Sequence, residues 1–396
     1  MPNDTLGNGG YVHKHASSIF PVILRDLWKF FVIICNSSFL NFCAILPLMR
    51  RNHEVIDIQN LLTPAGTIAE EGWARYPVWK YNRKDIKASA FKIKEWDYYA
   101  VVSHKHNIAV CGTISDLGYA GLFAMAFVDY KSGKCAQTDA MKFLTLGRTG
   151  LSAASKTDNT VCFKSRKLSL HWDTELDTRH ITIKAPGLIL PNGQKGFEAD
   201  ISLYQDPVSQ SMNIATSWKE NRKAFYLNEK VNCMPATGTV KLGNETLQLS
   251  PDEASGVLDW GRGRWTYKNT WYWASGNGFA NGHSFGFNLG YGFTDRTPAS
   301  ENVIFYDGVA HKINDVNFYI PDEDFTKPWA FTSSDGRFEM DFIPAVDRSS
   351  HMDFKIIASE QHQVFGYFTG QAVLDNGEII EVKDFPAFAE KVYNKY

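Results

Sequence analysis

The stretch that decides the fold runs from residue 256 to residue 293 and reads GVLDWGRGRWTYKNTWYWASGNGFANGHSFGFNLGYGF. Aromatic residues and glycines alternate along it. Because side chains on an extended strand point to opposite faces in turn, this alternation predicts strands with two different faces. One face of the first strand carries Asp259, Gly261, Gly263, Trp265 and Tyr267, and the other carries Trp260, Arg262 and Arg264. The two glycines leave room beside a carboxylate and two rings, which would suit an apolar ligand.

Two further strands continue the aromatic pattern. Trp271 and Trp273 are in phase on the first of them, and the second runs to Tyr291 and Phe293. Two interpretations stay open: the rings fill a packed core, where each can remove about 150–250 Å² from water, or they line a cavity. For the cavity interpretation, the candidate substrate-binding residues are Trp260, Arg262, Arg264, Trp265, Tyr267, Trp271, Trp273, Asn288 and Tyr291.

Asp259 is the candidate catalytic residue. If Arg262 pairs with it, the carboxylate stays ionised and serves as a structural partner and a poor acid. If it lies in a ring-lined cavity, desolvation favours the protonated form, which can donate a proton to a ligand. Arg262 or Arg264 would then anchor a polar head group or orient the acid.

The chain after residue 55 also reads as short strands. Segments rich in β-branched and aromatic residues alternate with turn signals such as Asn192-Gly193 and Asp335-Gly336. Helix is expected only at 386–393 and for a turn or two near 137–144. Many short strands at near-regular spacing predict an all-β fold of barrels or sandwiches with little helix. The expected strands include 98–103, 108–114, 122–129, 200–204, 238–242, 283–293 and 364–374.

A similar order of motifs occurs in both halves of the chain. It begins with Trp96-Asp97-Tyr98 in the first half and with Trp271-Tyr272-Trp273 in the second, although the spacings differ. A chance match therefore competes with a true repeat. A true repeat predicts two tandem β units that divide within 249–255. The predicted units are an N-terminal extension at 1–54, a first β unit at 55–250 and a second β unit at 251–396.

Composition excludes several classes of protein. The chain has 396 residues, of which 41 are Lys or Arg and 43 are Asp or Glu, so it lacks the basic surplus of a typical nucleic-acid-binding protein. Hydrophobic residues make up 44 %, which is enough for a core and excludes a disordered chain. The 11 Trp, 17 Tyr and 27 Phe suit a sheet-rich protein with a ring-lined interior.

The cysteines and the N-terminus bear on localisation. The six cysteines form no C-x-x-C pair, and we interpret them as scattered thiols in a reducing compartment, which predicts a cytoplasmic protein. Residues 30–48 carry no charge and are long enough for one membrane crossing, although four Asn and Ser residues interrupt them. Three interpretations stay open: a membrane anchor at 30–48, a signal peptide, or an extension translated from a wrong start with Met49 the true initiator. We favour the third.

Metal and cofactor motifs are weak or missing. His104 and His106 point to the same face of a strand and could begin a metal site, but no third ligand follows at a suitable spacing. The sequence contains no P-loop and no H-E-x-x-H motif. We therefore predict no metal and no cofactor, and expect a hydrophobic small molecule as the partner and no nucleic acid.

Five motifs give the sequence a family resemblance. They are LLTPAG at 61–66, EWDYY at 95–99, DWGRGRW at 259–265 with WYWA at 271–274, FYDG at 305–308, and FGYFTG at 365–370. In these motifs the chain resembles a bacterial family known only as domain of unknown function 2804. The resemblance covers residues 55–396 and excludes the N-terminal extension.

More distantly, the second half is similar to carotenoid hydratases and tocopherol-cyclase-like proteins. Their Asp-His-Gln-Trp-Gly motif maps onto this chain at Asp259 and Gly263, while Trp260, Gly261 and Arg262 replace its three central residues. The resemblance implies two tandem lipocalin-like, calycin-type β units that hold an isoprenoid-like or polycyclic molecule. It also implies a hydratase or cyclase in which Asp259 protonates a carbon–carbon double bond and aromatic faces stabilise the cation. A non-catalytic carrier of a hydrophobic ligand is the alternative.

Overall fold

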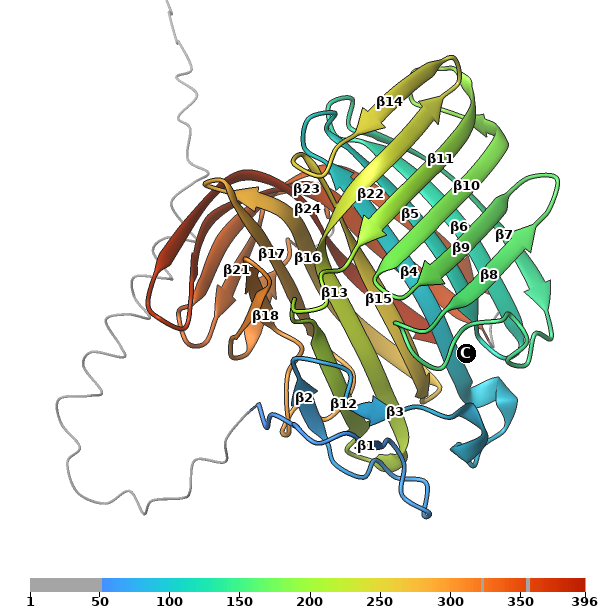
Figure 1. The fold of residues 1–396 in the computed structure, drawn as a ribbon, viewed down its shortest axis with the longest axis vertical. Coiled ribbons are helices and arrows are strands. Elements are labelled where there is room, and N and C mark those ends of the chain that lie inside the picture. Colours follow the sequence, from blue (N-terminus) through green and yellow to red (C-terminus); the bar gives the residue numbers. More distant parts are fainter. Residues whose placement is uncertain (1–51, 322–323, 354–356, 396) are drawn as a thin grey trace, which may run out of the picture. The chain divides into compact units, whose positions relative to one another are not determined.

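A computed structural model of the chain describes residues 52–321, 324–353 and 357–395. Two large sheets, in which every strand pairing is antiparallel, contain most of these residues (Figure 1). Two short 3₁₀ helices, η1 (Arg83–Asp85) and η2 (Ala90–Lys92), precede the first sheet. A separate parallel pair is formed by β1 (Gln59–Asn60) and β3 (Trp79–Lys80). The all-β fold predicted from the sequence is confirmed.

The first sheet has 13 strands within the described residues, and ten of them follow one another edge to edge. In spatial order these are β7 (Lys134–Phe143), β6 (Ala120–Asp129), β5 (Ile108–Asp116), β4 (Ile93–Ser103), β15 (Ala254–Arg264), β13 (Asn221–Leu242), β11 (Lys195–Tyr204), β10 (Thr178–Ile189), β9 (Ser169–Glu175) and β8 (Asn159–Lys164). Of the other three, β12 (Met212–Trp218) and β14 (Glu245–Leu249) pair with β13, and β2 (Gly72–Ala74) pairs with β12.

The second sheet has nine strands in the same part of the chain. In spatial order they are β19 (Val309–Lys312), β18 (Val303–Tyr306), β17 (His283–Tyr291), β16 (Lys268–Ala280), β24 (Ile379–Lys395), β23 (Ala358–Val373), β22 (Phe338–Asp353), β21 (Trp329–Ser333) and β20 (Val316–Tyr319). The chain passes from the first sheet to the second between β15 and β16. The sequence-based division at 250 places β15 with the second unit, whereas its hydrogen bonds join it to β4 and β13 in the first sheet.

The two expected helical segments are strands, so that prediction is wrong. Residues 386–393 lie in β24, and 137–143 lie in β7. Ala and Glu residues favour a helix at 386–393 in isolation. In the fold this segment pairs with β16 on one edge and β23 on the other, and these hydrogen bonds outweigh the local preference.

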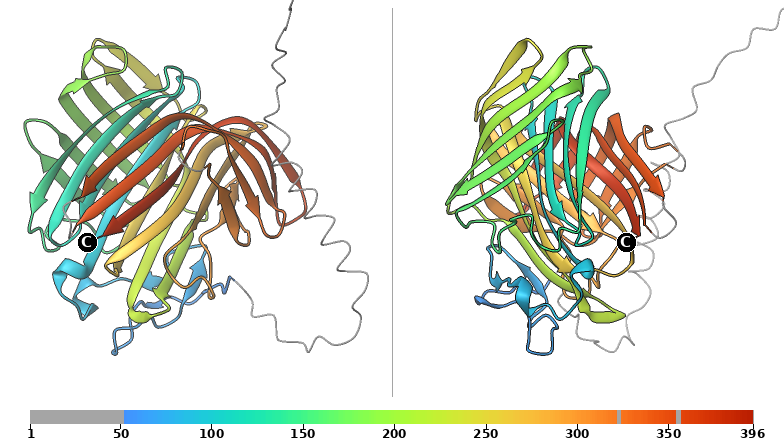
Figure 2. Two further views of the ribbon diagram at one scale, coloured as in Figure 1. Left: turned by 180° about the vertical axis from the view of Figure 1, so that it is seen from behind. Right: turned by 90° about the vertical axis from the view of Figure 1, so that its right-hand side faces the viewer.

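Each sheet curls around a core of its own (Figures 1 and 2). In the second sheet, Phe285, Phe287 and Leu289 of β17 are completely buried, and their neighbours include Phe338, Phe368 and Phe385. The packed-core interpretation is therefore confirmed for this strand. The inside of the second curl is filled by rings.

The opposite faces of the two sheets pack against each other. Tyr98 of β4 contacts Trp273 of β16 and Phe388 of β24, with ring centroids 5.6 and 6.2 Å apart. Trp273 belongs to this layer because its neighbours along β16, Tyr272 and Ala274, point into the second curl. The cavity described below lies in this layer between the two sheets.

Two expectations about the N-terminal part fall outside the structure. The uncharged segment 30–48 lies outside the described residues, as do Cys35 and Cys43. Among the residues that are described, no helix is long and apolar enough to cross a membrane. The four cysteines in this part of the chain are free thiols.

Candidate active site

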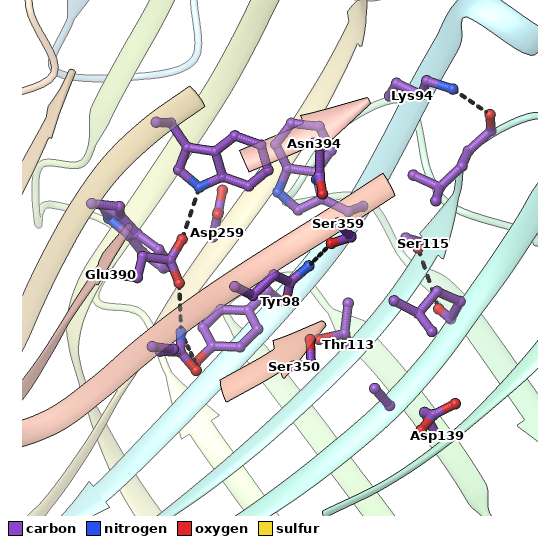
Figure 3. Close-up of a pocket in the computed structure, with 18 of the residues that line it drawn as sticks. Lys94, Tyr98, Thr113, Ser115, Asp139, Asp259, Ser350, Ser359, Glu390 and Asn394 are labelled. Atoms are coloured by element: carbon purple, nitrogen blue, oxygen red, sulfur yellow. Dashed lines mark hydrogen bonds between the residues drawn. The ribbon is translucent and has the colours of Figure 1, made fainter. Parts of the chain in front are cut away.

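A cavity of about 430 Å³ opens between the two sheets (Figure 3). Its walls come from β4–β7, β13 and β15 of the first sheet and from β16 and β22–β24 of the second. This volume lies in the range of about 300–1,000 Å³ that is typical of sites for small organic ligands. The cavity therefore lies inside neither curl but where the two sheets meet.

Indoles form one wall of the cavity. Trp265 packs edge-to-face on Trp96 and on Trp271, with ring centroids 5.6 and 5.8 Å apart, and stacks on Phe293 at 5.2 Å. Trp273 continues the wall next to Tyr98. Because each ring is held by others, the wall offers a ligand a preformed apolar surface.

Gly261 makes room for this wall. The Trp96 indole lies directly over the Gly261 backbone, where a Cβ atom would collide with the ring. A Cβ atom on Gly263 would collide with the carbonyl oxygen of Phe225 and would come close to the Trp265 indole. The space that the two glycines leave is thus taken by indoles of the protein, and the ring over Gly261 comes from the neighbouring strand.

A buried ion pair stands beside the indoles. The Asp259 carboxylate is 2.8 Å from the Lys230 ammonium and accepts a hydrogen bond of 2.6 Å from the Asn228 amide. The same ammonium lies 3.9 Å from the centroid of the Trp273 ring. The sequence analysis considered Arg262 as the partner of Asp259, but the partner is Lys230. An ammonium and an amide donor on its oxygens stabilise the ionised form of Asp259.

Glu390 is a second carboxyl group in the cavity wall. Its side chain accepts hydrogen bonds of 2.9 Å from the Trp271 indole and from the Gln363 amide. Burial raises the pKa of Glu390 to about 7, in spite of the bond from Trp271. Near neutral pH such a carboxyl group is partly protonated and can donate its proton.

The Lys230 ammonium interacts with more than one acidic side chain of the cavity. Glu301, on the loop before β18, also lines the cavity, and burial raises its pKa. The Lys230 ammonium opposes this rise in both Glu301 and Glu390, whereas the Asp259 carboxylate adds to it. We call Lys230, Asp259, Glu301 and Glu390 the cavity cluster. Arg348 also opposes the rise at Glu390 and Lys312 opposes it at Glu301, but burial outweighs these cations and both pKa values stay raised.

Gln363 fixes the environment of Glu390. The Gln363 carbonyl oxygen accepts a hydrogen bond of 2.6 Å from Arg348, which can only donate, so the amide NH₂ must face Glu390. The same NH₂ also lies 3.2 Å from the Tyr98 hydroxyl (Figure 3). Both carboxyl oxygens of Glu390 thus accept bonds from fixed donors, and each keeps a second lone pair that can carry the acidic proton.

The structure brings together four of the residues that the sequence analysis selected. Asp259, Trp265, Trp271 and Trp273 line the cavity. Asn288 does not line the cavity but supports two residues that do. Its carbonyl oxygen accepts a hydrogen bond of 2.7 Å from Trp273, and its NH₂ donates to the carbonyl of Glu301.

The other selected residues lie away from the cavity. Trp260 packs in the core of the first curl, and Arg262 is buried there with Asp97. Arg264 is on the same side of β15 and is not part of the lining. Tyr267 follows the end of β15 and is 49 % exposed, and Tyr291 stacks on Tyr272 in the second curl. Alternation assigned the faces correctly along β15, but it could not tell where the strand would end.

Sequence reasoning missed most of the cavity cluster. Glu390 and Lys230 are far from Asp259 along the chain and belong to no local motif. A strand interpretation of 386–395 was the available signal, because period-two alternation places Phe388, Glu390, Val392 and Asn394 on one face. The helix expected there concealed it.

The histidine pair does not form a cluster with other ligands. His104 bonds to the carbonyl of Asn277 and His106 to that of Gln248, each at 3.0 Å. Within 52–321, 324–353 and 357–395, no group of three or more His, Cys, Asp or Glu side chains is arranged to hold a metal ion.

The family resemblance drawn from five motifs is confirmed. The family described as a domain of unknown function, DUF2804, matches residues 52–396. The chain belongs to the DUF2804 family. No curated protein matches it in sequence.

Several solved structures are distantly similar to the chain. A crystal structure of CghA with Sch210972 has 9 % identity and a TM-score of 0.48, over 77 % of this chain and 89 % of that one. Kievitone hydratase from Nectria haematococca has 9 % identity and a TM-score of 0.41, over 88 % of this chain and 98 % of that one.

Proposed function

We propose that the protein binds a hydrophobic, isoprenoid-like or polycyclic molecule between its two sheets and catalyses an acid-initiated hydration or cyclisation of it. The observation that carries the proposal is the position of Glu390, a carboxyl group with a pKa of about 7 in a wall of indoles. An acid with a pKa near the working pH is best suited to transfer a proton.

The proton donor is Glu390 in this proposal, and Asp259 has a different role. Both oxygens of Asp259 are already engaged within the protein, one by the Lys230 ammonium and the other by the Asn228 amide. Its negative charge instead discourages the ionisation of Glu390 and can balance a positive charge that forms on the ligand. The proton-donor role expected of Asp259 therefore passes to its neighbour.

The reaction proceeds in two steps. The π electrons of an alkene take the proton of Glu390, so that a C–H bond forms, the O–H bond breaks and the neighbouring carbon becomes a cation. The faces of Trp271, Trp273 and Trp265 stabilise that cation. Water or a hydroxyl group of the ligand then adds to it, and the proton that is lost returns to the Glu390 carboxylate.

The test begins with native mass spectrometry of the isolated protein, which shows whether a small molecule accompanies it. Incubation with a total lipid extract should then give a product heavier by one water, or an isomer of a component. Glu390→Gln should lower the rate by about 100-fold or more while the amount of bound ligand stays the same. Asp341→Asn, an exposed acid on β22, is the matched control and should keep the full rate.

The competing function is that of a non-catalytic carrier, which would use the same cavity. Bound lipid that stays chemically unchanged would support the carrier and overturn the enzyme. Equal rates for Glu390→Gln and the wild type would remove Glu390 from the reaction.

A further inference from the structure

Strand β24 carries a second polar side chain into the cavity beside Glu390. Asn394 is four residues further along, so both side chains leave the same face of the strand. At about 3.3 Å per residue, their positions are about 13 Å apart. Asn394 lines the cavity near Ser359 (Figure 3). The cavity therefore has two polar points, one at the acid and one at Asn394.

The amide of Asn394 lacks a partner. The residue is only 9 % exposed, and its side-chain oxygen is buried without a hydrogen bond. A buried acceptor left in this state costs about 1–3 kcal/mol, so such atoms usually bond to a ligand or to water. The orphan oxygen thus indicates that a donor belongs beside it.

Hydroxyl and amide groups lie near this point, and the charged Lys94 and Asp139 also line the cavity. Ser359 lies opposite Asn394 in the register of β23 and β24, and it accepts a hydrogen bond of 3.1 Å from Gln361. Ser350 of β22 lies opposite Gln361 and also lines the cavity. Thr113 of β5 belongs to the facing wall (Figure 3). The hydroxyl and amide groups suit a hydrogen-bonding part of a ligand.

We infer that the ligand is an elongated isoprenoid-like alcohol, whose hydroxyl group bonds to Asn394 while its unsaturated hydrocarbon part lies among the tryptophans at Glu390. The inference rests on the proposed function, and it adds the substrate class and the orientation. A hydroxyl group both donates and accepts, so it matches either orientation of the Asn394 amide. A carboxylate can only accept, so it could bond to the amide NH₂ but would leave the amide oxygen unpaired.

The test compares farnesol with farnesyl methyl ether, which is identical except that its oxygen cannot donate. Isothermal titration calorimetry measures the affinity of each for the full-length wild type and for Asn394→Leu. We expect the wild type to bind farnesol about 10-fold more tightly than the ether, because the ether leaves the amide oxygen unpaired. In Asn394→Leu the ratio should fall to about 1.

The ether also reports the integrity of the variant. If Asn394→Leu binds the ether as the wild type does, its cavity is intact and a lost preference for farnesol is due to the amide alone. Equal affinities of the wild type for farnesol and the ether would overturn the inference and leave the proposed function standing. Tighter binding of farnesoic acid than of farnesol would also overturn it. If the wild type binds none of the three compounds, the inference fails, and the incubation with a lipid extract decides the proposed function separately.

Discussion

Strand β15 carries a buried charged cluster on each of its faces, and the two differ in how fully their hydrogen bonds are satisfied. On the face toward the first curl, Arg262 is completely buried and makes five hydrogen bonds, which equals its number of N–H donors. One goes to Asp97 and the others go to the backbone carbonyls of Ser152, Trp96 and Gly261. Every donor of this guanidinium has a partner within the protein.

The face toward the second sheet is incomplete. There the cavity cluster has one ammonium for three carboxyl groups, and the pKa values of Glu390 and Glu301 are raised by burial. Asn394 nearby has an unpaired oxygen. Saturated polar groups hold a fold together, whereas unsaturated ones beside a cavity are left to interact with something else. The comparison separates a guanidinium whose donors are all satisfied, on one face of β15, from carboxyl groups that line a cavity on the other.

The largest effect should come from breaking the saturated cluster. Arg262→Met removes the partner of Asp97 and leaves a buried carboxylate without compensation, so we expect the free energy of unfolding to fall by about 3–5 kcal/mol. Urea denaturation at neutral pH measures it. Arg264→Met, two residues along the same face but partly exposed, is the control and should cost less than about 1 kcal/mol. Equal losses in the two variants would contradict the distinction between the clusters.

The cavity cluster should make the stability of the protein depend on pH. The pKa of Glu390 is raised from an ordinary value near 4.5 to about 7, so the folded state binds this proton more tightly than the unfolded state does. Its contribution to stability is complete below pH 4.5 and is lost as the pH rises to about 7, a change of about 3 kcal/mol.

Glu390→Gln removes this dependence. Between about pH 4 and about pH 8, the variant should gain about 3 kcal/mol relative to the wild type, measured as the difference between their free energies of unfolding. Asp341→Asn should show no such gain. If the free energies of unfolding of Glu390→Gln and the wild type changed with pH in parallel, Glu390 would be ionised in the folded protein. It could then not be the proposed acid.

Part of this arrangement can be read from local sequence. Alternation separates Asp259 and Gly261 from Trp260 and Arg262, and the structure has them on opposite faces of β15. Periodicity carries this information because the side-chain period of a strand is two wherever the strand lies. Periodicity carries no information about which faces meet, so it could not distinguish the packed Phe287 from the cavity-lining Trp273.

Glu390, the proposed acid, could not be identified from local alternation. Glu390 is about 130 residues from Asp259 along the chain, and they share a cavity only because β24 pairs with β16 and the two sheets pack together. Such contacts depend on pairing between distant strands and not on propensity. The partner of Asp259 was missed for the same reason. Lys230 faces it across the β13–β15 ladder, whereas Arg262 is close in sequence but on the opposite face.

The smallest expected effect comes from adding one methyl group to the cavity face of β15. Gly261 lies on the cavity face of β15, and a methyl group there would collide with the Trp96 indole. Gly261→Ala should therefore displace the ring and lower the free energy of unfolding by about 1–3 kcal/mol, with a shift in tryptophan fluorescence. Gly187→Ala in β10 is the control, because no atom lies near its added methyl group, and it should be neutral or slightly stabilising. If Gly261→Ala behaved like Gly187→Ala, the indole would be free to move aside, and the wall of the cavity would be soft where the proposed chemistry needs it fixed.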